Sequence, residues 1–281
     1  MKKLLDKLGM NNRKTVTFGD SSLVKAPGGG GWTVITVAVV LFVWVLSDTF
    51  NWIEPIFWPR MADVWNQFIV ISSEGYRNAT LLEHIGVSVM RILGGFALGC
   101  LVGIPLGFAV ALSRTLNRIF DPIIEFFRPM PPLALIPLVI LWFGIDESAK
   151  IFLLFLASLW IMALSTRSGA MATNIAKVHC AYTLNANKKQ ILFKIILPNA
   201  LPEIFTGMRI AMGVCWGTVV AAELVAAESG IGMMIMVASK FLSTDIVVLG
   251  VILISIIAYA IDILMRVLEA KLVPWRGKGK A

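Results

Sequence analysis

Long apolar windows constrain this chain more than any other sequence feature. A hydrocarbon core about 30 Å thick needs a helix of roughly 20 apolar residues. Six windows approach or exceed that length: 32–50, 87–112, 119–143, 149–164, 204–225 and 246–268. Backbone polar groups find no water in lipid, so windows that cross it must be helical. With 58% hydrophobic residues, the sequence predicts an all-α, polytopic membrane protein with about six transmembrane helices.

The distribution of lysine and arginine predicts which helix ends face the cytoplasm. If the N-terminus is inside, 17 of the 25 lysines and arginines lie in tails and loops on that side. Only Arg60, Arg77, Lys150 and Lys240 lie outside, and the rest fall within the apolar windows. Cytoplasmic segments near membrane ends carry the excess of these residues. We therefore expect both termini to be cytoplasmic.

This orientation divides the chain into three parts. We expect a cytoplasmic N-terminal tail (1–31), a transmembrane domain (32–268) with a cytoplasmic loop at about 167–200, and a cytoplasmic C-terminal tail (269–281). Four consecutive glycines follow Pro27, which is typical of a flexible linker. A basic rim beside anionic membrane lipid accounts for the net charge of +8, so we expect no nucleic-acid partner.

No residue pattern in this sequence indicates a metal site, an ATPase or another enzyme. The two histidines, His84 and His179, have no partner at metal-ligand spacing, so we expect no metal site. The phosphate-binding pattern G-x-x-x-x-G-K-[ST] is absent, so the chain is not expected to be an ATPase. No cluster of nucleophiles or carboxylates at membrane depth suggests an enzyme. We therefore predict no catalytic residue and no cofactor bound by this chain.

The segment HCAYTLNANKKQILFKIILPNALP, residues 179–202, interrupts the apolar pattern. Residues 168–184 suit a helix, and Asn185 can adopt the left-handed conformation that ends it. Asn187 can cap a second helix, with Gln190 at capping-box spacing.

The second helix of this segment is amphipathic. Its apolar stripe consists of Ile191, Leu192, Ile195 and Ile196, while Lys188 and Lys189 begin a polar face. Pro198 and Pro202 are predicted to stop the helix and redirect the chain. Two short helices around a tight break suit a groove on another protein. The alternative is a mere connecting loop.

The segment resembles the EAA coupling motif of ATP-binding-cassette importer permeases, E-A-A-x3-G-x9-I-x-L-P. His179, Cys180 and Ala181 stand at the E-A-A positions, Asn185 at the glycine, and residues 195–198 at I-x-L-P, with the spacing intact. His179 lacks the carboxylate of the motif, and Asn185 replaces its glycine. The resemblance implies an ATPase-coupling role for His179, Cys180, Ala181, Asn185, Ala186, Asn187, Lys188, Leu192, Ile195, Leu197 and Pro198.

The resemblance extends from about residue 32 to the end of the chain. It is close in DPIIEFFRPMPPLALIPLVILWFGI (121–145), LPEIFTGMRIAMGVCWGTVVAAEL (201–224) and SGIGMMI (229–235). These segments are similar to the taurine, alkanesulfonate, nitrate and bicarbonate permease branch, and most similar to the taurine permeases. The resemblance implies a type I importer permease fold and a translocation path for a small anionic or zwitterionic solute. Taurine or another sulfonate is the solute it favours, with nitrate, bicarbonate or another small solute as alternatives.

The same resemblance implies an assembly in the bacterial inner membrane. Its expected members are a second copy of this chain, two ATP-binding-cassette ATPase subunits that use ATP and Mg, and one periplasmic solute-binding protein. Closure of the ATPases would push the 179–198 segment and tilt the permease helices. The rival hypothesis is an autonomous secondary transporter or channel, but such proteins usually show internal repeats, and none is convincing here.

Charged residues inside or beside the windows are candidates for the solute path. Glu125 and Arg128 sit three apart on one helical face, where an ion pair competes with a solute contact. Arg209 lies within the fifth window, where a charge is costly and suggests function. The alternative is that it pairs with Glu203 or with backbone carbonyls. Glu223, near the outer end of that window, is expected to meet water.

Two features of the windows concern packing. Pro129, Pro131, Pro132 and Pro137 are expected to break or kink the third window. The glycines of the second window, at positions 94, 95, 99, 103 and 107, are expected to allow close helix packing.

Overall fold

A computed structural model of the chain describes residues 29–50, 52–77 and 79–275, which divide into two compact units. The first unit, residues 1–53, carries helix α2 (Gly29–Thr49), which occupies the first predicted window. Residues 29–31, predicted to belong to a linker, begin this helix instead. The predicted tail before residue 29 lies outside the described residues.

The second unit, residues 54–281, contains all the other elements, and each regular element among the described residues is helical. They are α3 (Met61–Glu74), α4 (Leu81–Leu112), α5 (Arg114–Phe127), the 3-10 turn η1 (Pro132–Leu135), α6 (Ile136–Phe143), α7 (Glu147–Met171), α8 (Ile175–Thr183), α9 (Lys188–Ile191), the π-helical turn η2 (Leu192–Ile196), α10 (Leu197–Ala226), α11 (Ile231–Lys240) and α12 (Thr244–Leu272).

Four helices of the described part are long and apolar enough to cross a membrane. They are α4, α7, the continuous helix Lys188–Val225 that includes α10, and α12, which confirms the second, fourth, fifth and sixth windows. Helix α2 covers most of the first window, and its segment Val34–Thr49 is an apolar helix. An all-helical chain with several such helices confirms the predicted fold class of a multi-pass membrane protein.

The third predicted window is broken, as its prolines suggested. Helix α5 ends at Phe127, and α6 follows after the 3-10 turn that begins at Pro132, with a bend of 88° between the two halves. Proline has no N–H to continue a helix, and it disfavours helical backbone in the residue before it. The bent pair can count as one span, which gives up to five spans among the described residues.

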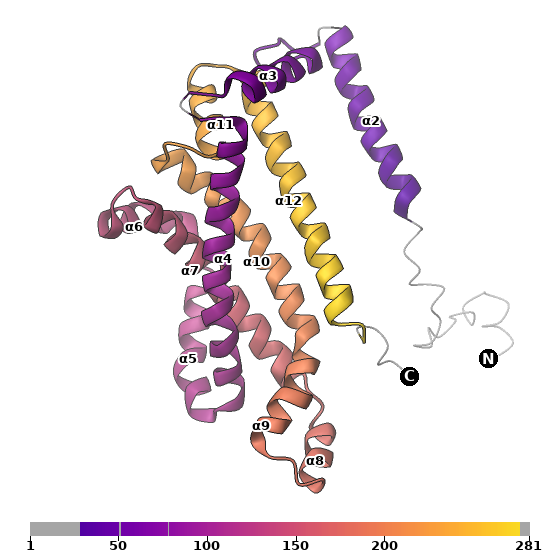
Figure 1. Cartoon of the computed structure of the whole chain (residues 1–281), viewed down its shortest axis with the longest axis vertical. Coiled ribbons are helices and arrows are strands. Elements are labelled where there is room, and N and C mark those ends of the chain that lie inside the picture. The colour runs from indigo at the N-terminus through magenta and orange to yellow at the C-terminus, as the bar shows by residue number, and fades with distance from the viewer. Residues whose placement is uncertain (1–28, 51, 78, 276–281) are drawn as a thin grey trace, which may run out of the picture. The chain divides into compact units, whose positions relative to one another are not determined.

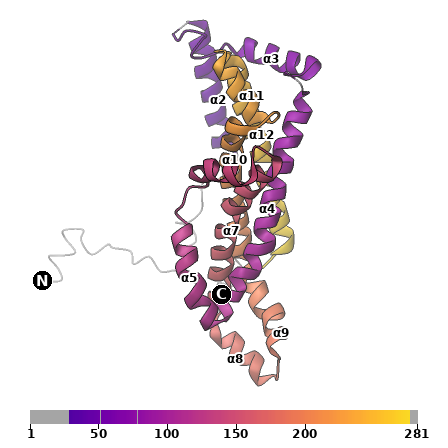
Figure 2. The ribbon, with the colours of Figure 1, turned by 90° about the vertical axis from the view of Figure 1, so that its left-hand side faces the viewer.

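The centre of the second unit is the contact between α4 and α7, with α10 beside both (Figures 1 and 2). Gly95, Gly99, Gly103 and Gly107 recur every four residues on the face of α4 that meets α7. A Cβ on Gly103 would lie 2.8 Å from the Leu159 carbonyl oxygen. The two backbones therefore approach closely because these side chains are absent, which confirms the predicted role of these four glycines. The prediction was wrong for Gly94, where an added Cβ would meet no atom within 4 Å.

The ends of this helix bundle carry different short elements. Helices α8 and α9 lie at one end, and α3 and α11 at the other (Figures 1 and 2). Helix α3 packs on α12 and buries Val64 and Ile71, and α11 packs between α10 and α12. Helix α12 continues to Leu272, so the predicted C-terminal tail begins four residues later than expected.

Candidate functional site

The predicted coupling segment forms two short helices around a tight turn, called here the helical hairpin (residues 175–198). The predicted first helix over 168–184 is not continuous, because α7 ends at Met171 and α8 begins at Ile175. Asn174 causes the new start: its side chain accepts a hydrogen bond from the N–H of Ala176 at 2.8 Å. A capping asparagine satisfies a helix donor that would otherwise have no partner.

Asn185 ends the first helix of the hairpin as predicted, with φ +59°. Its N–H donates to the Tyr182 carbonyl at 2.9 Å, and the Ala186 N–H donates to the Ala181 carbonyl at 3.0 Å. These two bonds make a complete Schellman motif, the usual end of a helix whose next residue is left-handed. The turn geometry is therefore fixed by backbone hydrogen bonds.

Asn187 starts the second helix as predicted. The N–H of Gln190 donates to the Asn187 side chain at 2.8 Å, and the N–H of Asn187 donates to the Gln190 side chain at 2.9 Å. This reciprocal pair is a capping box. Only one residue, Ala186, separates the end signal at Asn185 from this start signal, so the angle between the two helices has little freedom.

The prolines after the hairpin do not stop its second helix, contrary to prediction. The chain continues from Lys188 to Val225 through the π-helical turn η2, whose wider ring places the Leu197 N–H on the Leu192 carbonyl. A local π turn is one way in which a helix accommodates proline. Pro202 cannot donate to the Pro198 carbonyl, and that oxygen accepts a hydrogen bond from the Trp275 indole at 3.1 Å instead.

The helical hairpin has a packed side and an exposed side. Ala181, Ile191 and Ile196 are buried together with Ala170 of α7, and Val178, Ala186, Leu192 and Ile195 pack against them. His179, Cys180 and Lys188 are exposed, while Leu197 and Pro198 are half-buried. Tyr182 and Leu184 are 51% and 78% exposed at the tip. The hairpin therefore offers an apolar tip on a rigid base.

The charged residues predicted for the solute path are paired differently from expectation. The Arg209 Nε donates to an Asp262 oxygen on α12 at 2.9 Å, and Asp262 also accepts from Arg266 at 2.7 Å. Glu203, the predicted partner, takes no part in this group. The partner was missed because Asp262 is 53 residues away in the sequence.

Glu125 and Arg128 do not form the predicted ion pair. Arg128 is the residue at which α5 ends, and both side chains are exposed. No ion pair of the described residues joins them. Arg128 keeps helical backbone angles and its N–H donates to the Ile124 carbonyl, so the two residues share a helical face although no ion pair joins their exposed side chains. No ion pair of the described residues joins either of them to Arg209.

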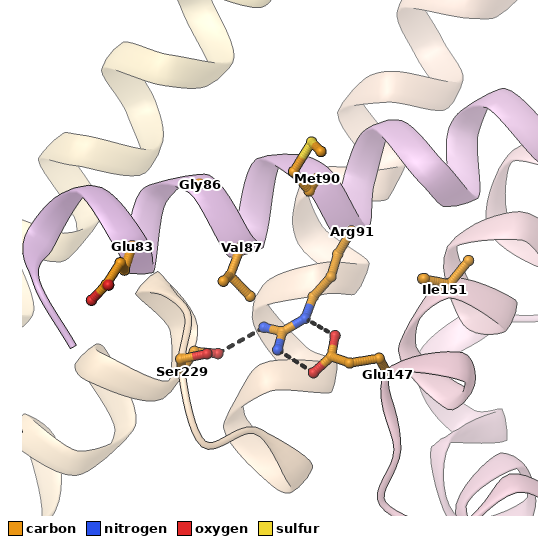
Figure 3. A pocket seen from close by; sticks show the side chains of 8 residues that line it. All are labelled: Glu83, Gly86, Val87, Met90, Arg91, Glu147, Ile151 and Ser229. Carbon is orange, nitrogen blue, oxygen red and sulfur yellow. Dashed lines mark hydrogen bonds and ion pairs between the residues drawn. The ribbon is translucent and has the colours of Figure 1, made fainter. Parts of the chain in front are cut away.

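An ion-pair cluster lies where α7 begins and α10 ends, whereas the hairpin joins the other ends of these two helices. Figure 3 shows part of this cluster. Arg91 of α4 donates from Nε and Nη2 to the two carboxylate oxygens of Glu147 at 2.6 and 2.5 Å. Its Nη1 donates to Glu223 and to the Ser229 carbonyl, each at 2.7 Å. Lys150 donates to Glu147 at 2.8 Å. The cluster joins α4, α7, α10 and the loop before α11.

Glu223 is fully buried, although exposure to water was expected. One of its oxygens accepts from Ser88 at 2.7 Å and from Arg91, and the other accepts from the Gly232 N–H at 2.8 Å. A buried carboxylate is stable only when it is paired and hydrogen-bonded, and Glu223 has both kinds of partner. Gly230, with φ +132°, brings the loop against this carboxylate.

His84 extends the cluster towards the start of α4. The Gly230 N–H donates to His84 Nδ1 at 3.0 Å, so the imidazole proton must reside on Nε2. Nε2 then donates to the Tyr76 carbonyl at 3.1 Å. Both ring nitrogens are satisfied by backbone groups. Among the described residues no group of three or more His, Cys, Asp and Glu side chains is arranged to hold a metal ion.

Two cavities meet at the ion-pair cluster. One of about 610 Å³ is lined by Glu83, Gly86, Val87, Met90, Arg91, Glu147, Ile151 and Ser229 (Figure 3). A second of about 520 Å³ is lined by Ile145, Asp146, Glu147, Lys150, Val225, Ala227, Glu228 and Ser229. Glu147 and Ser229 line both. Sequence reasoning missed this site, and its only signal was the cost of ionisable residues inside or beside apolar windows.

Comparison with known proteins identifies the family that shares this sequence pattern. Residues 81–274 match the family described as "Binding-protein-dependent transport system inner membrane component". The chain is 43% identical over 244 residues to the taurine transport system permease protein TauC of Escherichia coli, covering 86% of this chain and 89% of that protein. It is 38% identical over 236 residues to the putative aliphatic sulfonates transport permease protein SsuC of the same organism, covering 84% and 88%.

A solved structure shares the fold. A chain from the MetNI methionine ABC transporter, in inward-facing conformations, aligns with a TM-score of 0.55 at 21% identity. The match covers 66% of this chain and 95% of that chain.

Proposed function

This chain belongs to the family of binding-protein-dependent transport system inner membrane components, and we propose that it forms the membrane path of an importer for a small sulfonate, taurine first. The chain is a permease subunit of an ATP-binding-cassette transporter and not an enzyme. The observation that carries the choice of solute is the 43% identity to TauC over most of both chains, which exceeds the 38% identity to SsuC.

The proposed coupling element is the helical hairpin. Its tip presents Tyr182 and Leu184 to a partner, and its two ends are fixed by the Schellman motif and the capping box. A groove on an ATPase subunit would receive this apolar tip. His179 and Cys180, at the E-A-A positions, are exposed beside it. A rigid hairpin transmits displacement because it cannot absorb it by bending.

Displacement of the hairpin would reach the membrane helices by two routes. The first is the unbroken helix from α9 through η2 into α10. The second is packing on Ala170, in the last turn of α7. ATP-driven closure of the partner subunits would therefore tilt α7 and α10 together. A solute-loaded binding protein shifts this equilibrium only by binding one of the two states more tightly.

The proposed assembly contains two copies of this chain, two ATPase subunits and one periplasmic solute-binding protein. ATP and Mg would be used by the ATPase subunits, and this chain would bind no cofactor. The proposed orientation in the inner membrane has the hairpin and both termini in the cytoplasm. Support comes from the 17 basic residues on that side and from the hydrogen bond between Trp275 and Pro198, which holds Trp275, three residues after α12, at the hairpin. The basic residues on the cytoplasmic side would contact anionic membrane lipid.

Gentle extraction from the native membrane tests this assembly. We expect mass spectrometry of the intact complex to find an ATP-binding-cassette ATPase at two copies per two permease chains. A chain that stays alone after cross-linking would instead favour an autonomous transporter. Thermal-shift screening of the co-encoded binding protein against taurine, ethanesulfonate, nitrate and bicarbonate then tests the solute. Stabilisation by nitrate or bicarbonate alone would refute the sulfonate proposal.

A further inference from the structure

One exposed carboxylate in the ion-pair cluster neutralises two buried cations. The Glu147 side chain is 54% exposed, whereas the side chains of Arg91 and Lys150 are 3% and 5% exposed. Figure 3 shows Glu147 facing Arg91 at the margin of the larger cavity. The Glu147 carboxylate is therefore the easiest member of the cluster to move, and it covers the buried cations Arg91 and Lys150.

The charge balance of the cluster depends on Glu147. Arg91 and Lys150 contribute two positive charges, and Glu223 and Glu147 contribute two negative charges. If Glu147 rotated away, Arg91 would keep its ion pair with Glu223, but buried Lys150 would lose the one carboxylate with which it is paired among the described residues, which is unfavourable. Glu147 is the first residue of α7, and its side chain is 54% exposed. Another anion would be needed in its place.

The donors that Glu147 covers also match a group with three oxygens. Arg91 presents Nε and Nη2, and Lys150 presents Nζ, while Arg91 Nη1 stays occupied by Glu223 and Ser229. Glu147 serves these three donors with two oxygens, because Oε1 accepts from both Nη2 and Nζ. A sulfonate has three acceptor oxygens and would offer one to each donor.

We propose that Arg91 and Lys150 form a binding site for the sulfonate group of a small solute, and that Glu147 occupies this site when no solute is present. The inference rests on the proposed function, since it assigns a sulfonate to the permease itself. The cavity beside Arg91 has apolar walls from Val87, Met90 and Ile151 that would contact the carbon chain of the solute. The position is at the bundle end opposite the hairpin, where the solute would enter.

The experiment uses the full chain purified with its ATPase subunits in nanodiscs of zwitterionic lipid, in buffer without sulfate or phosphate. Thermal unfolding is followed with added ethanesulfonate, taurine, sulfate or ethylammonium. The variants are Glu147→Ala and Glu147→Gln. The matched control is Glu74→Ala, an exposed carboxylate of α3 that lines neither cavity and forms no ion pair among the described residues.

We expect Glu147→Ala to lower the unfolding temperature and ethanesulfonate to restore it. The apparent affinity for ethanesulfonate and taurine should exceed that of the unaltered protein by about tenfold or more, because the competing carboxylate is gone. Ethylammonium should have no effect, and Glu74→Ala should respond like the unaltered protein. The double variant Arg91→Met, Glu147→Ala should lose the response to sulfonate, since the bidentate donor is missing.

Several results would overturn the proposal. They are a folded Glu147→Ala or Glu147→Gln protein that ignores ethanesulfonate, an equal response in the double variant, and a response to sulfate without one to ethanesulfonate. Glu147→Gln keeps the shape of the side chain and removes its charge, so it supplies the test if Glu147→Ala does not fold. Nanodiscs with anionic lipid form a further arm: stabilisation of Glu147→Ala by the lipid alone, with no response to sulfonate, would assign the site to a lipid phosphate.

This test separates the inference from the proposed function. ATPase subunits that co-purify with every variant would support the importer whatever the anions do. Absence of the ATPase would contradict the importer, while the sulfonate response of the chain could still be measured.

Discussion

Asn185 provides the most direct test of the helical hairpin, because its left-handed backbone is required by the turn and is independent of its side-chain chemistry. At φ +59° an L-residue has its Cβ close to the following carbonyl, which costs roughly 1–2 kcal/mol, while glycine avoids this cost and asparagine tolerates it better than most residues. Asn185→Gly should therefore keep the turn, and Asn185→Val should strain it.

The size of the effect follows from the backbone. Asn185→Val should shift the hairpin towards open conformations by about 1–2 kcal/mol, and 1.4 kcal/mol is a factor of ten in an equilibrium constant. Because the Asn185 and Ala186 N–H groups hold the turn through Tyr182 and Ala181, an altered φ would release both bonds. We expect the affinity for the ATPase subunit to fall about tenfold.

The assay is binding of the purified ATPase subunit to the permease in nanodiscs, measured by biolayer interferometry. Asn185→Gly is the matched control, since it removes the same side chain and relieves the strain. The unfolding temperature of the membrane helices should stay the same in both variants, because the turn lies outside the α4 and α7 core. Equal affinity of the Val and Gly variants would refute a conformational role for Asn185.

Three further predictions concern packing, capping and docking. Gly103→Ala should destabilise the protein by about 1–3 kcal/mol in detergent unfolding, since its Cβ would lie 2.8 Å from a carbonyl of α7. Gly94→Ala should be neutral or stabilising, because a Cβ at Gly94 would meet no atom within 4 Å. A smaller loss for Gly103→Ala than for Gly94→Ala would contradict the packing argument. Trp275→Phe keeps an aromatic ring but removes the donor to the Pro198 carbonyl, and we expect faster hydrogen exchange in the hairpin; unchanged exchange would show that the bond is dispensable. Leu184→Asp, at a position 78% exposed, should weaken ATPase binding without lowering the unfolding temperature, and full binding would exclude the tip as the contact surface.

The backbone of the hairpin was largely predictable because its signals are local. Asn185 prefers a left-handed conformation, and Asn187 and Gln190 form a capping box three residues apart, so the turn follows from neighbouring residues alone. The prolines were misread for the same reason. Pro198 and Pro202 predict the end of a helix when only neighbouring residues are considered. The π turn and the Trp275 indole instead supply hydrogen bonds for backbone carbonyls that the prolines leave without a donor.

The ion pairs were not predictable, because their members are far apart in the sequence. Arg91 lies 56 residues from Glu147 and 132 residues from Glu223, and Arg209 lies 53 residues from Asp262. A charged residue in an apolar window indicates that a partner exists, because an isolated buried charge is too costly. Which residue is the partner depends on which helices pack together.

The sequence by itself therefore determined the apolar helices, the glycine face, the broken third window and the hairpin turn, since each depends on residues within one or two helical turns. The tertiary structure alone decided that Glu223 is buried, that Asp262 pairs with Arg209, and that Glu147 covers Arg91 and Lys150 beside a cavity. The physical reason is that local backbone preferences act between neighbours, whereas burial and charge pairing are set by the packing of helices that are distant in the chain.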